Sequence, residues 1–133
     1  MLAISSDILN EIVQKCKAAA PREACGLLFG ADGVISTWTE TANVAADPLR
    51  HFEIDPAALI AALRAERHRG PRLLGYWHSH PSGDAAPSAT DAAMAAPDGK
   101  LWLIVGGGAI TAWRAVENGA AHGRFAPVEI VVG

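Results

Sequence analysis

Apolar residues recur every four positions near the start of the chain and then gather in short runs. Over residues 5–20, the positions Ile8, Ile12 and Cys16 fall on one face, which predicts an amphipathic helix. A serine precedes the pattern as a cap, and Pro21 prevents the helix from continuing. A buried strand is predicted next, with the sequence ACGLLFG, and the alternating stretch VISTWTETANV is typical of the second arm of a hairpin.

The second half of the chain alternates between helix and strand signals. Asp55 can cap a helix that has Pro56 at its first position and ends at Gly70. A strand follows with the sequence RLLGYWHSH, and then a short alanine-rich helix over residues 88–96. The triple glycine 106–108 fits a tight turn between two strands better than a nucleotide loop, and RFAPVEIVV forms the last strand. The order αββαβαβββ predicts an α/β fold with a mixed, largely antiparallel sheet flanked by helices.

Composition narrows the class of protein. The chain has 133 residues, half of them hydrophobic and 19% charged, which predicts one domain over 1–133. A net charge of −3 without a basic cluster argues against nucleic-acid binding, and no apolar run is long enough for a membrane span or a signal peptide. Cys16 and Cys25 are isolated and are expected to be reduced and buried. We therefore expect a cytoplasmic protein, and the sequence leaves homo-oligomerisation open.

Histidine is scarce, yet two of the five histidines stand two residues apart in the stretch GYWHSHPSGDAAPSATD. On a strand, His78 and His80 point to the same side. Ser88 and Asp91 lie on the first turn of the following predicted helix and can face the same point. Two histidines and a carboxylate are the three protein ligands of many catalytic zinc sites, in which water takes the fourth position. The spacing of Ser88 and Asp91 also matches a helix capping box, so a purely structural role stays open.

A hydrolytic zinc site needs a carboxylate that accepts a proton and passes it to the leaving group. The candidate is Glu23, at the start of a buried strand, although an exposed loop glutamate would give the same pattern. Trp77 and Ser79 alternate to the side opposite the two histidines and are expected to be structural. The remaining histidines lack metal-like spacing and are expected to be exposed: His51, His68 and His122. His122 is also kept as a candidate contact at the rim of the substrate site.

Together, PREACGLLFG and GYWHSHPSGDAAPSATD resemble the JAMM (MPN+, JAB-type) zinc metalloprotease family. Its pattern is an upstream glutamate, then H-[S/T]-H-P, then a serine and, after two residues, an aspartate, and this chain matches every position. The stretch NVAADPLRHFEIDP is also similar to the short bacterial members, so the resemblance covers nearly the whole chain. It implies one Zn²⁺ per chain, held by His78, His80 and Asp91. It also implies that Glu23 is the general base and then the general acid, and that Ser88 donates to the oxyanion.

The resemblance further implies a peptidase or isopeptidase that cuts after the C-terminal Gly-Gly of a ubiquitin-like or sulfur-carrier protein. The chain is too short for the insertions with which larger members grip a second ubiquitin, and an extended tail could pair with a sheet edge. Two alternatives are a non-catalytic MPN scaffold and a phage-tail type peptidase with another peptide substrate. A zinc deaminase has a related layout, but its H-x-E and P-C-x-x-C elements are missing.

Overall fold

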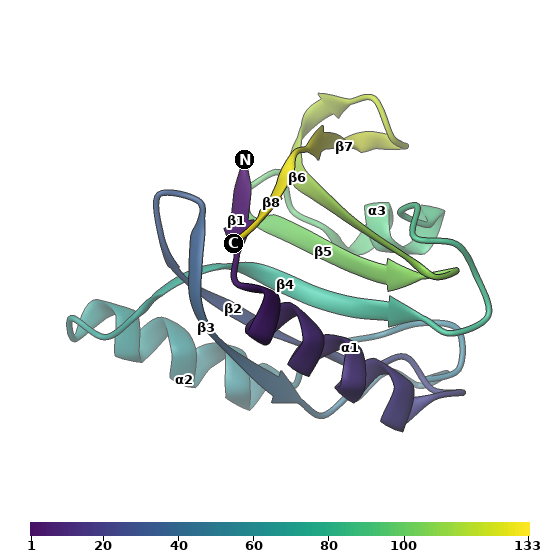
Figure 1. Ribbon diagram of the computed structural model, residues 1–133, viewed down its shortest axis with the longest axis horizontal. Coiled ribbons are helices and arrows are strands. Elements are labelled where there is room, and N and C mark those ends of the chain that lie inside the picture. Colours follow the sequence, from purple (N-terminus) through teal and green to yellow (C-terminus); the bar gives the residue numbers. More distant parts are fainter.

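The computed structural model describes residues 1–133 and contains one eight-stranded mixed sheet and three helices (Figure 1). In chain order the elements are β1 (Leu2–Ile4), α1 (Ser6–Ala19), β2 (Cys25–Ala31), β3 (Val34–Thr41), α2 (Pro56–Arg67), β4 (Arg72–His80), α3 (Ala89–Met94), β5 (Leu101–Gly106), β6 (Ala109–Gly119), β7 (Gly123–Val128) and β8 (Ile130–Val132). The strand order is β7-β6-β5-β4-β2-β3-β1-β8, and only the pairs β4–β5, β1–β3 and β1–β8 are parallel. The predicted fold class is confirmed.

The helices cover the sheet on two faces. On one face, α1 buries Ile12 and Cys16 against strand residues that include Leu28 and Leu103 (Figure 1). On the other face, α2 packs on the ends of β2 and β4, and α3 packs beside Trp102. Cys16 and Cys25 are both free and buried, as predicted. None of the three helices has the length and apolar character needed to span a membrane.

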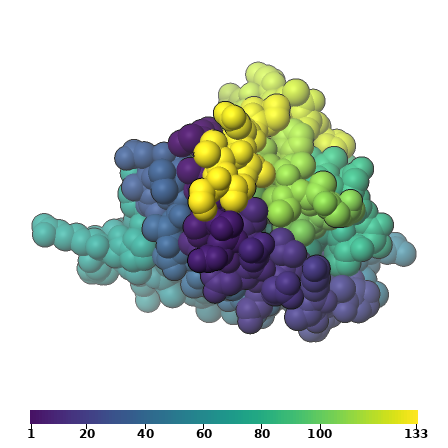
Figure 2. Space-filling model, in the orientation of Figure 1, coloured from purple at the N-terminus to yellow at the C-terminus, as the bar shows by residue number.

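The sheet curls until its two edges meet. Strands β7 and β8 lie at opposite edges, yet only Glu129 separates them along the chain. The carbonyl of Glu129 accepts a hydrogen bond from the Leu2 N–H at 2.8 Å, and Leu2 pairs with Ile130. Figure 2 accordingly shows the N-terminal residues (purple) beside the C-terminal ones (yellow). The prediction of a single last strand is therefore wrong, because the chain changes partners at Glu129, and β1 was not predicted.

Local signals set most of the element ends. Ser5 caps α1 by accepting from the Ile8 N–H, and Asp55 caps α2, which carries Pro56 in its first turn. Helix α2 ends at Arg67, earlier than the predicted Gly70. In the triple glycine, residues 107 and 108 have φ of 57° and 74°, which confirms the tight turn between β5 and β6.

The register between β2 and β4 places the functional residues. Cys25 pairs with His78 and Gly26 pairs with Trp77. The indole of Trp77 is fully buried and lies across Gly26, so that its Nε1 donates to the Thr39 carbonyl at 3.0 Å. Trp77 is therefore a core residue, as predicted, and the two histidines face the side covered by α3.

Candidate metal centre

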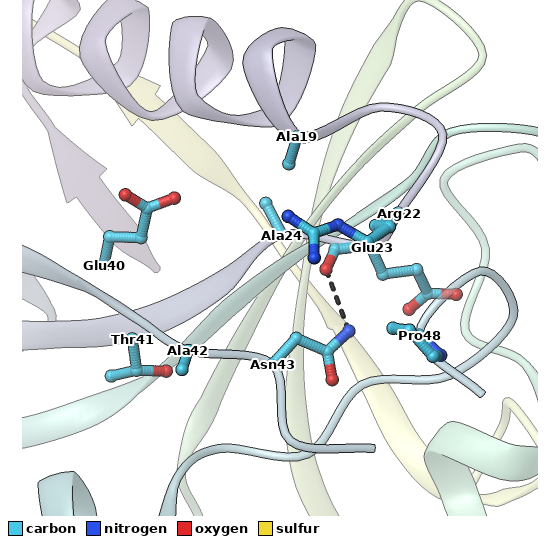
Figure 3. A pocket seen from close by; sticks show the side chains of 9 residues that line it. All are labelled: Ala19, Arg22, Glu23, Ala24, Glu40, Thr41, Ala42, Asn43 and Pro48. Carbon is cyan, nitrogen blue, oxygen red and sulfur yellow. Dashed lines mark hydrogen bonds between the residues drawn. The ribbon is translucent and has the colours of Figure 1, made fainter. Parts of the chain in front are cut away.

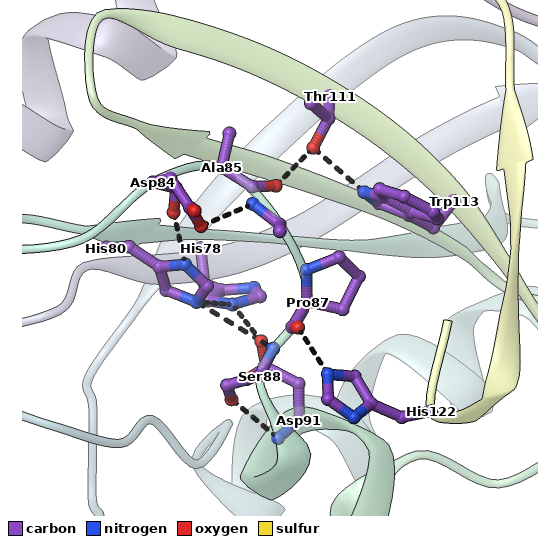
Figure 4. A network of polar contacts seen from close by, with 11 residues as sticks. His78, His80, Asp84, Ala85, Pro87, Ser88, Asp91, Thr111, Trp113 and His122 are labelled. Carbon is purple, nitrogen blue, oxygen red and sulfur yellow. Dashed lines mark hydrogen bonds and ion pairs between the residues drawn. The ribbon is translucent and has the colours of Figure 1, made fainter. Parts of the chain in front are cut away.

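Three potential metal-ligand atoms converge where β4 ends and α3 begins (Figure 4). His78 Nε2 lies 3.0 Å from His80 Nε2 and 3.2 Å from Asp91 Oδ2, and His80 Nε2 lies 3.1 Å from Asp91 Oδ2. With zinc–ligand bonds of about 2.0–2.1 Å and tetrahedral angles, ligand atoms stand about 3.3 Å apart. The nearly equilateral triangle of ligand atoms therefore fits a small tetrahedral metal ion.

The imidazole of His80 is oriented through its other nitrogen. His80 Nδ1 donates to the Asp84 carbonyl at 2.8 Å. Because Nδ1 makes this bond, Nε2 is the ring nitrogen that is left to face Asp91 and His78. A histidine that binds a metal commonly has this kind of second partner.

The imidazole of His78 is oriented by packing instead. Its ring is fully buried and stacks on Phe52 with centroids 4.1 Å apart and planes 20° apart. The ring of Trp102 meets it edge-on, with a centroid distance of 5.7 Å and an interplanar angle of 88°. His78 Nδ1 has no hydrogen-bond partner, so these aromatic contacts hold the ring and direct Nε2 at the site.

Burial and hydrogen bonding shift the pKa values of all three residues of the triangle. Burial lowers the pKa of His78, which keeps this imidazole neutral. Burial alone would raise the pKa of Asp91, but the hydrogen bonds from His78 and His80 outweigh it and hold the pKa well below its usual range. For His80, burial lowers the pKa, and the bonds to Asp91 and Asp84 outweigh that effect and raise it. An anionic carboxylate therefore lies buried between two nitrogen ligands.

Glu23 lies beside this triangle without joining it by a hydrogen bond. One of its carboxylate oxygens and the ring nitrogens of His78 and His80 lie within 4.8 Å of one another. Its Oε1 is buried and has no hydrogen-bond partner. Burial raises the pKa of Glu23 to about 7, with Asp91 raising it further and His80 opposing. A carboxyl group with this pKa can both accept and release a proton near neutral pH.

The backbone around Glu23 is held on both sides. Its N–H donates to the Pro48 carbonyl at 2.8 Å, and its carbonyl accepts from Asn43 Nδ2 at 2.9 Å (Figure 3). The next residue, Ala24, donates its N–H to Ser79 Oγ at 2.9 Å. Ser79 is thus structural, as predicted, and it joins the glutamate segment to the strand that carries both histidines.

Ser88 makes the predicted capping box with Asp91. Ser88 Oγ accepts from the Asp91 N–H, and Asp91 Oδ2 accepts from the Ser88 N–H, both at 3.0 Å. Capping does not consume the hydroxyl proton, because Ser88 Oγ acts only as an acceptor in this pair. The same serine can therefore cap α3 and donate to a ligand in the cleft.

Two cavities adjoin Glu23. One, of about 340 Å³, is lined by Glu23, His80 and Ser88 together with the loops at Leu49–Arg50 and at residues 81–87. The other, of about 350 Å³, lies by the backbone of Glu23, with Arg22 and Asn43 among its lining residues (Figure 3). The first cavity is lined by a candidate metal ligand (His80), the candidate base (Glu23) and a hydroxyl that can donate to an oxyanion (Ser88). We therefore take it as the reaction cleft.

The structure thus brings together all five residues that the sequence singled out: Glu23, His78, His80, Ser88 and Asp91. The sequence analysis missed Asp84, whose contribution is a backbone carbonyl and carries no side-chain signal. It also missed Asn43, whose amide makes four hydrogen bonds within the loop that supports Glu23. A signal for Asn43 was present, because asparagine is uncommon in strands and it stands near the end of the alternating stretch VISTWTETANV.

Fold and site together define a hydrolase of the JAMM metalloprotease class. The chain belongs to the family described as prokaryotic homologs of the JAB domain, whose model matches residues 5–117.

Comparison with known proteins agrees with this family. The chain is 36% identical over 110 residues to a desampylase of Haloferax volcanii, covering 77% of this chain and 78% of that protein. It is 36% identical over 91 residues to a probable TtuB-protein conjugate cleaving protease of Thermus thermophilus, covering 68% of this chain and 61% of that protein. A solution structure of a protein from Desulfitobacterium hafniense is similar over the whole of this chain and 93% of that one, with a TM-score of 0.84 and 25% identity.

Proposed function

We propose that this chain is a zinc-dependent isopeptidase or peptidase that hydrolyses the amide bond after the C-terminal Gly-Gly of a ubiquitin-like or sulfur-carrier protein. The observation that carries the proposal is the triangle of His78 Nε2, His80 Nε2 and Asp91 Oδ2, with sides of 3.0–3.2 Å, beside the buried Glu23 carboxyl. Two imidazoles and one carboxylate form a ligand set that suits zinc and leaves one position open.

The residues of the chain would divide the reaction among them. His78, His80 and Asp91 would hold one zinc ion, which lowers the pKa of a bound water to about 7 and polarises a carbonyl. Glu23 would accept a proton as the amide carbon is attacked and would return it to the leaving amine. Its pKa of about 7 suits both steps.

Ser88 would stabilise the negative charge that develops on the substrate carbonyl oxygen. Its Oγ accepts from the Asp91 N–H, so the hydroxyl proton remains available for the oxyanion. A donor fixed at the start of α3 needs little reorganisation during the reaction, which is the basis of oxyanion stabilisation.

The substrate class rests on the relatives and on the cleft. One relative is named for cleaving TtuB–protein conjugates and another is named a desampylase, which favours a conjugate of a small protein. The cleft of about 340 Å³ runs between two loops, and a tail of two glycines has no side chains to obstruct entry. We also propose that the chain acts in the cytoplasm as the single domain expected from its length.

The test is incubation of the zinc-loaded protein with two substrates. One is a sulfur-carrier protein with a C-terminal extension and the other is the same carrier joined to a lysine, and mass spectrometry identifies the products. Cleavage directly after Gly-Gly by the wild type, and none by Glu23→Gln, would support the proposal. Bound zinc without cleavage of either substrate would refute the substrate class and favour a different peptide.

A further inference from the structure

The loop between β4 and α3, residues 81–88, carries backbone groups on which the metal centre depends. The Asp84 carbonyl accepts from His80 Nδ1, and the Ser88 N–H donates to Asp91 Oδ2. Most residues of this loop are exposed, whereas Ala85 and Pro87 are buried. The two buried residues are therefore the points at which the rest of the fold can fix the loop.

Side chains from the β6–β7 hairpin hold the carbonyls of these two residues (Figure 4). Thr111 Oγ1 donates to the Ala85 carbonyl at 2.5 Å, and Trp113 Nε1 donates to Thr111 Oγ1 at 2.8 Å. An indole N–H can only donate, so the threonine hydroxyl must direct its own proton at Ala85. His122 Nε2 donates to the Pro87 carbonyl at 3.0 Å.

Each of these bonds fixes one end of a peptide unit, and the other end of that unit donates either to the metal ligand Asp91 or to Asp84, which supports His80. The Pro87 carbonyl and the Ser88 N–H belong to the same planar peptide, so His122 fixes the direction in which that N–H meets Asp91. In the same way, the peptide that begins at the Ala85 carbonyl ends at an N–H that donates to Asp84 Oδ1. Asp84 in turn receives the bond from His80.

The backbone is strained at His122 and closely packed at Gly106. His122 has a φ of 52°, in the left-handed region that side chains with a Cβ disfavour. Glycine adopts this φ without strain, so the presence of a strained histidine indicates a role for its imidazole. At the end of β5, a Cβ on Gly106 would stand 2.8 Å from the Asp84 carbonyl, and glycine leaves room for the loop.

We propose that Thr111, Trp113 and His122 form a hairpin clamp that positions the metal centre through the 81–88 loop. They are positioning residues, because they reach His80, Ser88 and Asp91 only through the loop backbone. The kinetic part of the proposal rests on the proposed peptidase function. The metal-binding part is independent of that function, so the two can fail separately.

Two pairs of variants of the full chain separate positioning from general stability. Thr111→Val keeps the shape and removes the hydroxyl, whereas Thr111→Ser keeps the hydroxyl. His122→Gly removes the imidazole and relieves the positive φ, whereas His122→Gln keeps a donor nitrogen and the strain. Arg124→Ala is the control within the same hairpin, because Arg124 bonds the Val116 carbonyl and not the loop.

The readouts are the zinc dissociation constant by competition with a coloured chelator, the thermal midpoint, and kcat and KM. We expect Thr111→Val and His122→Gly to weaken zinc binding about tenfold to a hundredfold and to lower kcat with little change in KM. We expect Thr111→Ser, His122→Gln and Arg124→Ala to resemble the wild type, and the thermal midpoint of His122→Gly to stay unchanged.

Wild-type zinc affinity in both Thr111→Val and His122→Gly would overturn the clamp. So would equal losses in all four clamp variants accompanied by lower midpoints, because that would mean a purely structural role. If the wild type cleaves no conjugate, the proposed function fails, and the zinc measurements still decide the clamp.

Discussion

Replacement of Glu23 by glutamine tests the electrostatics of the site most directly. The change keeps the shape of the side chain and removes its ability to ionise. Burial raises the pKa of Glu23 to about 7, whereas a glutamate in an unfolded chain has a pKa of about 4.3. The folded state therefore holds the proton more tightly, so the wild type loses stability as the pH rises from about 4.3 through about 7. Glutamine does not ionise, so the variant does not lose stability in this way at any pH.

The size of the effect follows from the pKa difference. Each pKa unit corresponds to about 1.4 kcal/mol, so the full loss in the wild type is at most about 4 kcal/mol above pH 7. For the metal-free protein we expect Glu23→Gln to be about 2 kcal/mol more stable than the wild type at pH 8, and less than about 1 kcal/mol more stable at pH 5, where most of the loss has not yet developed. Bound zinc favours the carboxylate, so the advantage of glutamine should shrink in the metal-loaded protein.

Urea denaturation at pH 5 and pH 8, with and without zinc, measures these differences, and Glu117→Gln serves as an exposed control. In the same variant, turnover should fall by a factor of about 10² to 10⁴ while zinc remains bound. An advantage that is identical at both pH values would refute the argument from burial. Loss of zinc from Glu23→Gln would make Glu23 a ligand and refute its role as the base.

The remaining predictions concern the ligands, the cap and the core. Asp91→Ala should abolish both zinc binding, measured by metal analysis after dialysis, and turnover. Ser88→Ala should destabilise the fold by about 1 kcal/mol through loss of the cap and should lower kcat by a factor of about 10² to 10³, and an unchanged chemical step would contradict the oxyanion role. Gly26→Ala should destabilise the fold by about 3 kcal/mol or more in urea denaturation, because its Cβ would lie 2.0 Å from the Thr39 carbonyl and 2.3 Å from Trp77 Nε1.

Local chemistry made much of this fold predictable. The caps at Ser5 and Asp55 and the glycine turn after β5 each follow from the preference of a residue type for one backbone geometry. The three-residue strand β1 has too few positions to show a period. The break at Glu129 depends on which distant strands offer a free edge, which no local pattern reveals.

The metal ligands could be predicted from the sequence, whereas the contacts that orient them could not. His78, His80 and Asp91 lie within fourteen consecutive residues, so their spacing alone indicates convergence. The contacts that orient them bridge longer separations, 26 residues from Thr111 to Ala85 and 35 from His122 to Pro87. His122 was expected to be exposed and is exposed, but its nitrogen meets the loop backbone. Sequence spacing cannot report such a contact, because it depends on how the β6–β7 hairpin folds over the loop.

The position of Glu23 is explained by strand register rather than by a motif of its own. A strand shifted by one residue turns every side chain to the opposite face, so β2 and β4 must pair in one register for Glu23 and His78 to share a face. Trp77 provides that restriction, because its indole can lie across the neighbouring strand only where glycine stands, at Gly26. With Gly26 opposite Trp77, Cys25 stands opposite His78, and Glu23, two residues earlier, faces the same side. The buried tryptophan therefore fixes the strand register that places the base and the metal ligands on the same side of the sheet.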